Sequence, residues 1–309
     1  MHADFANYPY FPMPFNAYVL SLLNGVIKFF NILFQRKALA KSVKHKIVSL
    51  DGTLINVFQF NPDKTLLDNA GSKKLPAIVY YHGGAFVLGY LPTHIASMNM
   101  YAQRAHCAVF MVDYRLAPKY VFPKGFEDCY AALQWVSSNA SKLGIDETKI
   151  AVAGDSAGGC LAAGVAQKSA DKKESVICGQ LLIYPVLDKD SKTMSATQFV
   201  NTPSWNSVGN RRMWEVYLKN YKSNDIPIYA APADKKDLSG LVPAYIENAE
   251  FDPLRDEAEA YSMRLQAAGV RTVFNATKGT VHGYDTAFHS AISKHAMQQR
   301  LDFLKSIFC

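Results

Sequence analysis

The chain has 309 residues, of which 49% are hydrophobic and 19% are charged, with 18 glycines, 14 prolines and five cysteines. This composition is that of an ordinary globular protein, and it excludes the disordered, collagen-like and disulfide-scaffold classes. The formal net charge is +7, and residues 1–50, with six basic residues and one acidic residue, carry +5 of it. Because the remaining chain is close to neutral, no basic stripe of the kind that binds nucleic acid is indicated.

The N-terminal region contains an apolar stretch at residues 15–34 that is interrupted by three asparagines and Lys28. We interpret it as an amphipathic helix that covers an apolar surface, within an N-terminal cap segment of residues 1–42. Its basic charge indicates a solvated face, and contact with an anionic membrane is an alternative that we do not expect. A targeting segment is a further alternative, because Ala38-Leu39-Ala40 resembles a cleavage site.

Strand-like and helix-like runs alternate after residue 42. Strands are predicted at 43–50, 53–60, 76–81, 107–112, 149–153, 179–184, 242–248 and 271–276, and helices at 93–105, 124–139, 157–169, 253–268 and 286–307. The first two strands are predicted to form a hairpin around Asp51-Gly52, and residues 61–74 to form a surface loop. The later alternation predicts an α/β fold with a mostly parallel sheet of about eight strands and helices on both faces.

Residues 188–225, with Trp205 and Trp214, do not fit the alternation. We predict that they form a second cap segment, a lid over a pocket at the carboxyl ends of the strands. One catalytic domain is then made of residues 43–187 and 226–309.

Glycines follow the predicted strand 76–81 directly, in the sequence His82-Gly83-Gly84. Adjacent glycines at a strand exit allow backbone N–H groups to turn toward one point, as the stabilisation of an oxyanion requires. A simple glycine turn is the alternative. We expect His82 to order this loop through its ring hydrogen bonds rather than to act as a base.

The strand 149–153 runs into Gly154-Asp155-Ser156-Ala157-Gly158, followed by a helix rich in small residues. This is the GxSxG pattern in its required context of strand, sharp turn and helix, which presents a nucleophilic serine. The small residues two before and two after Ser156 prevent collisions in the turn. Taken alone the pattern is weak, and a helix N-cap or a tight turn would also explain it.

An acid and a histidine follow Ser156 in the order that α/β-hydrolases use, with Asp252 after the strand 242–248 and His282 after the strand 271–276. Because all three lie at strand exits on one edge of the sheet, we expect them to converge. Asp256 and Asp285 compete as the acid, and Asp256 is expected to pair with Arg255 or Arg264 instead. The other histidines are expected to be ordinary surface or core residues, among them His94, His106, His289 and His295.

The five cysteines include no pair with CxxC spacing. Three of them are predicted to be buried free thiols, namely Cys107, Cys129 and Cys178. This favours a reducing compartment, so we expect a cytoplasmic protein that needs no metal.

Six motifs together resemble the hormone-sensitive-lipase family, the bacterial-type family IV of α/β-hydrolase esterases, over roughly residues 76–308. They are HGGAF at 82–86, DYRLAP at 113–118, GDSAGG at 154–159, YPVLD at 184–188, DPLRDE at 252–257 and HGY at 282–284. The resemblance implies an α/β-hydrolase fold with a helical cap and hydrolysis of short- to medium-chain esters without a cofactor.

The resemblance also implies roles for individual residues. Ser156 resembles the nucleophile, His282 the base and Asp252 the acid. The implied oxyanion donors are the N–H groups of Gly83, Gly84 and Ala157. Residues expected to be structural around the site are Asp113, Arg115, Asp155 and Glu250.

This sequence departs from the family pattern at Cys160, Lys119 and Tyr284. None of the three touches the implied triad. Tyr284, where phenylalanine is usual, is expected to alter the pocket wall and with it the acyl preference. Cys160 is expected to be a packed small residue rather than a reactive thiol.

The functional hypothesis is a carboxylesterase that acts through an acyl-enzyme intermediate. One alternative is a non-catalytic protein that binds a small molecule on the same fold, and another is a lipase that acts on longer-chain lipid esters at a membrane surface. An amidase or peptidase is a third variant, although no propeller domain fits in 309 residues. The strand 271–276 is a candidate edge strand, through which a homodimer is expected.

Overall fold

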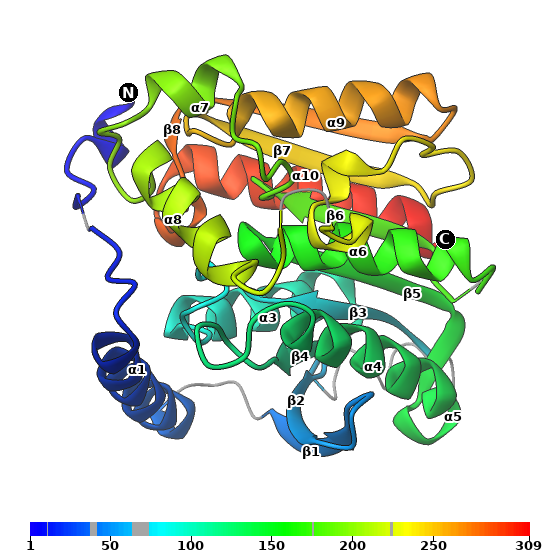
Figure 1. Ribbon diagram of the computed structural model, residues 1–309. Helices are drawn as coiled ribbons and strands as arrows, with labels where there is room; N and C mark the ends of the chain where they lie inside the picture. Colours follow the sequence, from blue (N-terminus) through cyan, green and yellow to red (C-terminus); the bar gives the residue numbers. More distant parts are fainter. Residues whose placement is uncertain (11, 38–41, 64–73, 175, 223–224) are drawn as a thin grey trace.

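A computed structural model describes residues 1–10, 12–37, 42–63, 74–174, 176–222 and 225–309 (Figure 1). The Ala38-Leu39-Ala40 triplet lies outside the described residues, and so does most of the loop predicted at 61–74.

Eight strands form a single sheet with the order β1-β2-β4-β3-β5-β6-β7-β8. The strands are β1 Val43–Val48, β2 Leu54–Phe60, β3 Leu75–Tyr81, β4 Ala108–Asp113, β5 Ile145–Asp155, β6 Gly179–Ile183, β7 Ala244–Phe251 and β8 Thr272–Val281. β1 and β2 pair as the predicted antiparallel hairpin, β2 is antiparallel to β4, and the other neighbours are parallel. The predicted α/β-hydrolase sheet is confirmed, and β8 is an edge strand as expected.

Helices cover both faces of the sheet. One face packs against α4 (Lys124–Ser138), α6 (Ala157–Asp171) and α9 (Arg255–Ala267), and the other against α3 (Pro92–Ala105) and α10 (Ala291–Phe308), as Figure 1 shows. The short α5 (Ala140–Leu143) precedes β5.

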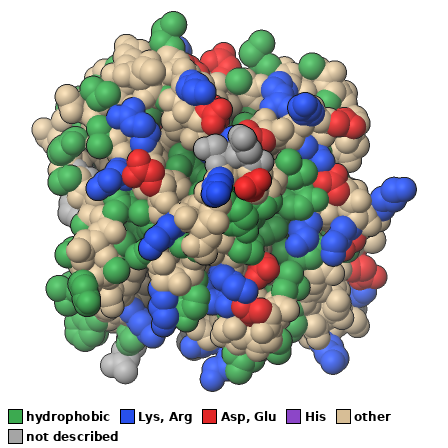
Figure 2. Space-filling view, viewed as in Figure 1, with side chains coloured by type: hydrophobic (Ala, Val, Ile, Leu, Met, Phe, Trp, Pro, Cys, Tyr) green, Lys and Arg blue, Asp and Glu red, His purple; other side chains and the backbone are tan. Residues whose placement is uncertain are grey.

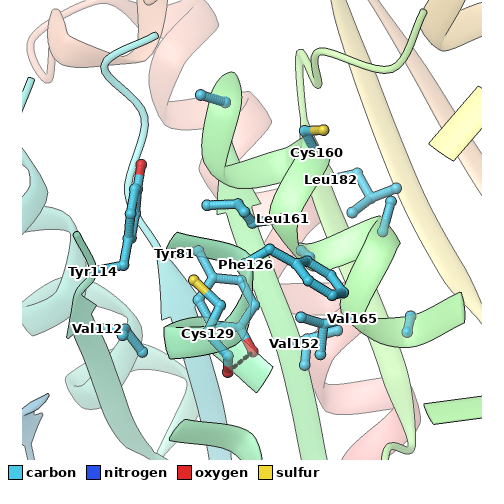
Figure 3. Close-up of a cluster of buried hydrophobic side chains, with 14 of the residues drawn as sticks. Tyr81, Val112, Tyr114, Phe126, Cys129, Val152, Cys160, Leu161, Val165 and Leu182 are labelled. Carbon is cyan, nitrogen blue, oxygen red and sulfur yellow. Dashed lines mark hydrogen bonds between the residues drawn. The ribbon is translucent and has the colours of Figure 1, made fainter. Parts of the chain in front are cut away.

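The apolar core lies between the sheet and these helices. Figure 3 shows its α4–α6 side, where Tyr81 and Val152 of the strands meet Phe126 and Cys129 of α4 and Leu161 of α6. The Tyr81 hydroxyl donates to the carbonyl of Cys129 at 3.1 Å, so this buried polar atom is satisfied. Burial of this cluster fixes β3, β5 and α6, the elements that position the loop at 82–86 and Ser156.

The elements that carry candidate site residues differ from the prediction at their ends. β5, β7 and β8 run on to Asp155, Phe251 and Val281, so each ends directly before Ser156, Asp252 or His282. α9 begins at Arg255 and not at Pro253, because the carboxylate of Asp252 accepts the N–H of Leu254 and forms a turn before the helix.

The C-terminal helix is also shorter than predicted. A 3₁₀ turn at Tyr284–Thr286 comes first, and α10 starts after Ser290, whose hydroxyl accepts the N–H of Ile292.

The two segments expected to form a cap lie at the carboxyl edge of the sheet. The N-terminal segment includes a 3₁₀ turn at Ala3–Phe5 and α1 (Ala17–Lys37), and the second segment includes α7 (Met194–Gln198) and α8 (Ser207–Tyr217). The N–H of Ser204 donates to the carbonyl of Pro9 at 3.1 Å, and the N–H of His2 donates to that of Gly279 at 2.8 Å. Residues distant in sequence are thereby joined above the strand ends.

Candidate active site

Ser156 occupies the turn between β5 and α6 with a left-handed backbone, φ +55° and ψ −119°. The two glycines of the pattern are needed because the chain passes very close to itself here. A Cβ on Gly154 would lie 2.2 Å from the carbonyl oxygen of Gly158, and one on Gly158 would lie 1.9 Å from that of Tyr81. The close packing around this turn therefore holds Ser156 in a strained backbone conformation.

The structure brings Ser156, His282 and Asp252 together in one hydrogen-bonded line. The Ser156 Oγ lies 2.9 Å from His282 Nε2, and His282 Nδ1 lies 2.6 Å from Asp252 Oδ2. The other oxygen of Asp252 accepts the N–H of Leu254 at 2.9 Å, so the carboxylate is held in place. With Nδ1–H donating to Asp252, Nε2 is free to accept the Ser156 proton, as a general base requires.

These three residues are almost completely shielded from solvent. Asp252 is 0% exposed, and Ser156 and His282 are 7% and 8% exposed. The ring of Tyr184 contacts the His282 imidazole edge-on at a centroid distance of 4.7 Å, and Trp205 lies at 6.1 Å. A hydroxyl in such a site is accessible to a ligand but little solvated.

The competing acids have other partners. Asp256 pairs with the guanidinium of Arg255 at 2.8 Å, as predicted. Asp285 pairs with Arg300 at 2.8 Å and accepts the hydroxyl of Tyr184 at 2.5 Å.

The loop at residues 82–86 differs from the prediction at one donor. The N–H of Gly83 donates to Asp155 Oδ1 at 2.9 Å, so it is already occupied. A Cβ on Gly83 would lie 2.2 Å from Asp155 Oδ2, so this contact itself requires glycine. Gly83 was expected to donate to an oxyanion, whereas in this structure its N–H donates to the side chain of Asp155.

The next two amides remain available. Gly84 and Ala85 have φ of +118° and +55°, and both line the same cavity as Ser156. Within the described parts of the chain, neither N–H has a hydrogen-bond acceptor. Ala157 is the first residue of α6, where the N–H has no partner within the helix.

Asp155 organises this loop from the end of β5. It accepts hydrogen bonds from the Tyr80 hydroxyl at 2.9 Å and the Gly83 N–H, and it pairs with His94 Nε2 at 3.2 Å. Burial disfavours its charge, but the charge of His94 and the hydrogen bonds from His94 and Tyr80 outweigh burial and lower the pKa of Asp155 to about 2. His94, expected to be an ordinary histidine, is thus part of the support of the loop. No signal in the sequence pairs it with Asp155, which is 61 residues away.

His82 was expected to order the loop through its ring hydrogen bonds. Its Nδ1 donates to the carbonyl of Gly83 at 2.7 Å, and its ring stacks on Tyr114 at 4.3 Å. Burial lowers the pKa of His82 to about 3, so the ring is neutral at pH 7.

The remaining named residues pack around the site. Glu250 accepts the N–H of Gly279 at 2.6 Å and so ties β7 to β8. Cys160 is buried, and burial raises the pKa of its thiol. Tyr284 does not form the pocket wall as expected, because it points into the core and donates to Glu247 at 2.8 Å.

A cavity of about 460 Å³ opens above Ser156. The N-terminal segment contributes Tyr8 and Met13 to its wall, and the second cap segment contributes Trp205. A second cavity of about 490 Å³ lies beside it and shares Met13 and Trp205 as lining residues. Pockets of this size accept small organic ligands.

The chain matches a family model described as alpha/beta hydrolase fold over residues 78–286. It is 42% identical over 217 residues to the carboxylesterase NlhH of Mycobacterium tuberculosis, covering 68% of this chain and 66% of that protein. It is 37% identical over 214 residues to an arylesterase of Saccharolobus solfataricus, covering 67% of each. The matched region thus spans about two thirds of these relatives.

Solved structures resemble the chain over nearly its whole length. A bacterial heroin esterase superposes with a TM-score of 0.84 at 33% identity, covering 94% of this chain and 93% of that one. A hyperthermophilic esterase from the archaeon Pyrobaculum calidifontis superposes with a TM-score of 0.83 at 32% identity, covering 96% of this chain and 99% of that one.

Proposed function

Because this chain belongs to the hormone-sensitive-lipase type of the α/β-hydrolase family, we propose that it is a carboxylesterase whose catalytic residues are Ser156, His282 and Asp252. The observation that carries the proposal is the line of short contacts from Asp252 through His282 to the Ser156 hydroxyl. The names of the relatives and structural neighbours support the same reaction class.

The first half of the reaction transfers the acyl group to the enzyme. His282 Nε2 takes the hydroxyl proton as Ser156 Oγ attacks the ester carbonyl, and Asp252 stabilises the resulting imidazolium. The tetrahedral intermediate collapses, its bond to the alcohol oxygen breaks, and His282 returns the proton to the leaving alcohol. The acyl group is then bound to Ser156 as an ester.

Water completes the cycle in the second half. His282 takes a proton from the water molecule as its oxygen attacks the acyl-enzyme carbonyl. The second intermediate releases the carboxylic acid, and the proton returns to Ser156 Oγ. Both halves use the same three residues, so no cofactor is required.

The negative oxygen of each intermediate is stabilised by backbone N–H groups. We assign this role to Gly84, Ala85 and Ala157, in place of the occupied Gly83. In comparable sites the loss of one such donor lowers kcat by roughly 10²–10³-fold. Asp155 supports this arrangement because its bond to Gly83 fixes the loop that carries two of the donors.

The substrates are short- to medium-chain acyl esters. A cavity of about 460 Å³ suits an ester of that size. Residues 1–42 and 188–225 act as the lid, since they contribute Tyr8, Met13 and Trp205 to the lining of the cavity.

Nitrophenyl esters of increasing chain length test this proposal on the whole protein. Ser156→Ala should lower kcat/KM for the best ester by at least about 10⁴-fold, because the nucleophile is gone. Ser239→Ala is the matched control, since Ser239 is exposed and does not line the cavity. Full activity in Ser156→Ala would exclude the mechanism. Saturable binding of esters without turnover by the wild type would favour the binding-protein alternative.

A further inference from the structure

The helix α1 exposes an unusual amount of apolar surface. Within the described residues it is the one helix long and apolar enough to cross a membrane, with a mean hydropathy of 1.6 over Ala17–Phe34, and 11% of that window is buried. Its large apolar side chains that are 36–87% exposed are Tyr18, Val19, Leu22, Val26, Phe29, Phe30, Ile32, Leu33 and Phe34. Figure 2 shows hydrophobic side chains at the lower left, where Figure 1 places α1.

Two asparagines hold the inner side of α1 to the protein. Asn24 donates to the carbonyl of Val87 at 2.8 Å and accepts the N–H of Gly89 at 2.9 Å, and Asn31 donates to the carbonyl of Tyr90 at 2.6 Å. At roughly 100° per residue, these asparagines and the buried Leu20 lie within about 40° of one another. The exposed apolar residues occupy an arc of roughly 200° on the opposite side. A helix on the surface of a soluble protein carries polar and charged residues over its exposed side.

Two exposed lysines lie on the same side of the molecule as the inner contacts of α1. Lys28 is exposed on α1 itself. Lys44 of β1 is also exposed and lies 5.8 Å from the centre of the Phe58 ring, which contacts Tyr90, the residue that accepts the hydrogen bond of Asn31. Residues 1–50 carry six basic residues and one acidic residue. An apolar helix face with adjacent basic residues suits a surface of anionic lipids.

We propose that α1 lies flat on an anionic lipid surface, with its apolar side in the lipid and its Asn24 and Asn31 side on the protein. A membrane span is a poorer fit, because it would break the three hydrogen bonds that hold these asparagines to residues 87–90. Pairing with a second copy of this chain is also poorer, because a two-helix seam covers a narrower stripe than this arc.

The docked helix places the cavity beside the lipid. Leu88 and Gly89, in the loop that α1 holds, line the cavity above Ser156. Esters dissolved in the lipid surface would then reach the cavity along this loop.

Vesicle flotation tests the proposal with the full chain. Wild type should float with phosphatidylcholine vesicles that contain phosphatidylglycerol, and less with pure phosphatidylcholine. Leu22→Gln/Phe29→Gln/Phe30→Gln should lower the partition coefficient at least tenfold, because it removes apolar side chains from the exposed side. Lys28→Glu/Lys44→Glu should lower binding to the vesicles that contain phosphatidylglycerol and leave binding to pure phosphatidylcholine unchanged.

A matched control uses exposed apolar residues elsewhere, Met194→Gln/Met263→Gln/Val273→Thr. It should float as wild type does, and thermal melts should show that every variant is folded. Equal flotation of the wild type and the α1 variant would overturn the proposal, as would no flotation at all. Light scattering that finds a dimer abolished by the α1 variant, without flotation of the wild type, would assign the surface to a second copy.

Discussion

At the residue scale, the candidate oxyanion donors are the backbone N–H groups of the loop that do not already donate a hydrogen bond within the protein. Asp155 accepts a hydrogen bond from the N–H of Gly83. The N–H groups of Gly84 and Ala85 have no acceptor in the described residues. The two remaining donors lie in left-handed conformations that the loop enforces, as does Ser156. Substrate therefore meets groups that have no competing partner, which is the condition for strong electrostatic stabilisation.

The assignment of the oxyanion donors predicts the geometry of a trapped intermediate. A crystal structure of the wild type with a phosphonate bound to Ser156 should place one phosphonyl oxygen roughly 2.7–3.1 Å from the amides of Gly84, Ala85 and Ala157. Gly83 should remain bonded to Asp155. An oxygen bonded to Gly83, with Asp155 displaced, would contradict the assignment.

The lowered pKa of Asp155 leads us to expect that the stability of the folded protein depends on pH. Its folded pKa of about 2 lies below the ordinary value of 3.8, so the carboxylate stabilises the folded state above about pH 4 and loses this contribution as pH falls through about 2. The difference corresponds to roughly 2 kcal/mol. Urea unfolding should find Asp155→Asn less stable than wild type by about that amount at pH 7. The gap should narrow at pH 3, and a gap that does not change with pH would contradict this role.

The sequence predicted part of this residue-level picture. Ser156, Asp252 and His282 were identifiable because the order and strand context of the three are specific, and they lie within hydrogen-bond distance of one another. The sequence did not show whether Gly83 or Ala85 has a free N–H group, because Asp155, at the end of β5, accepts the hydrogen bond of Gly83. His94 was missed for the same reason, since its contact with Asp155 is set by tertiary packing.

At the element scale, parallel strands that end at the same edge of the sheet bring the site together. Ser156, Asp252 and His282 follow β5, β7 and β8, which are close neighbours in the sheet. The alternation of apolar runs predicted these strands, while their ends were misplaced by several residues. The added residues, such as Thr277 and Thr280 of β8, are polar but buried through mutual hydrogen bonds, which no hydrophobic pattern reports.

A buried ion pair holds α10 to β7 beneath the His282 loop. The Arg300 guanidinium bonds to both oxygens of Glu247 and to Asp285, and Arg300 and Glu247 are 1% and 0% exposed. Arg300→Met should lower the free energy of unfolding by about 3–5 kcal/mol, because Glu247 would keep a buried charge without its partner.

Denaturant unfolding measures this change. Arg271→Met is the control, since Arg271 is exposed and makes one long contact with Ser306. A loss no larger than that of the control would show that the pair contributes little. The kcat for ester hydrolysis should also fall, because Asp285 lies three residues after His282 on the same loop.

At the scale of the whole molecule, the segments that do not belong to the alternating α/β pattern meet above the strand ends. The N-terminal residues and the loop before α8 line the same cavity, although about 190 residues separate Met13 from Trp205 in sequence. The net charge of +7 is concentrated in the first fifty residues. Most of the excess basic charge therefore lies in the segment that includes α1, and the rest of the chain is close to neutral.

The central claim is that Ser156 is the nucleophile of an ester hydrolase. Intact-mass and peptide mass spectrometry after treatment with a fluorophosphonate tests it directly. We predict a single phosphonyl group per chain, located on Ser156, absent from Ser156→Ala and present in Ser239→Ala. Labelling at another residue, or undiminished labelling of Ser156→Ala, would contradict it.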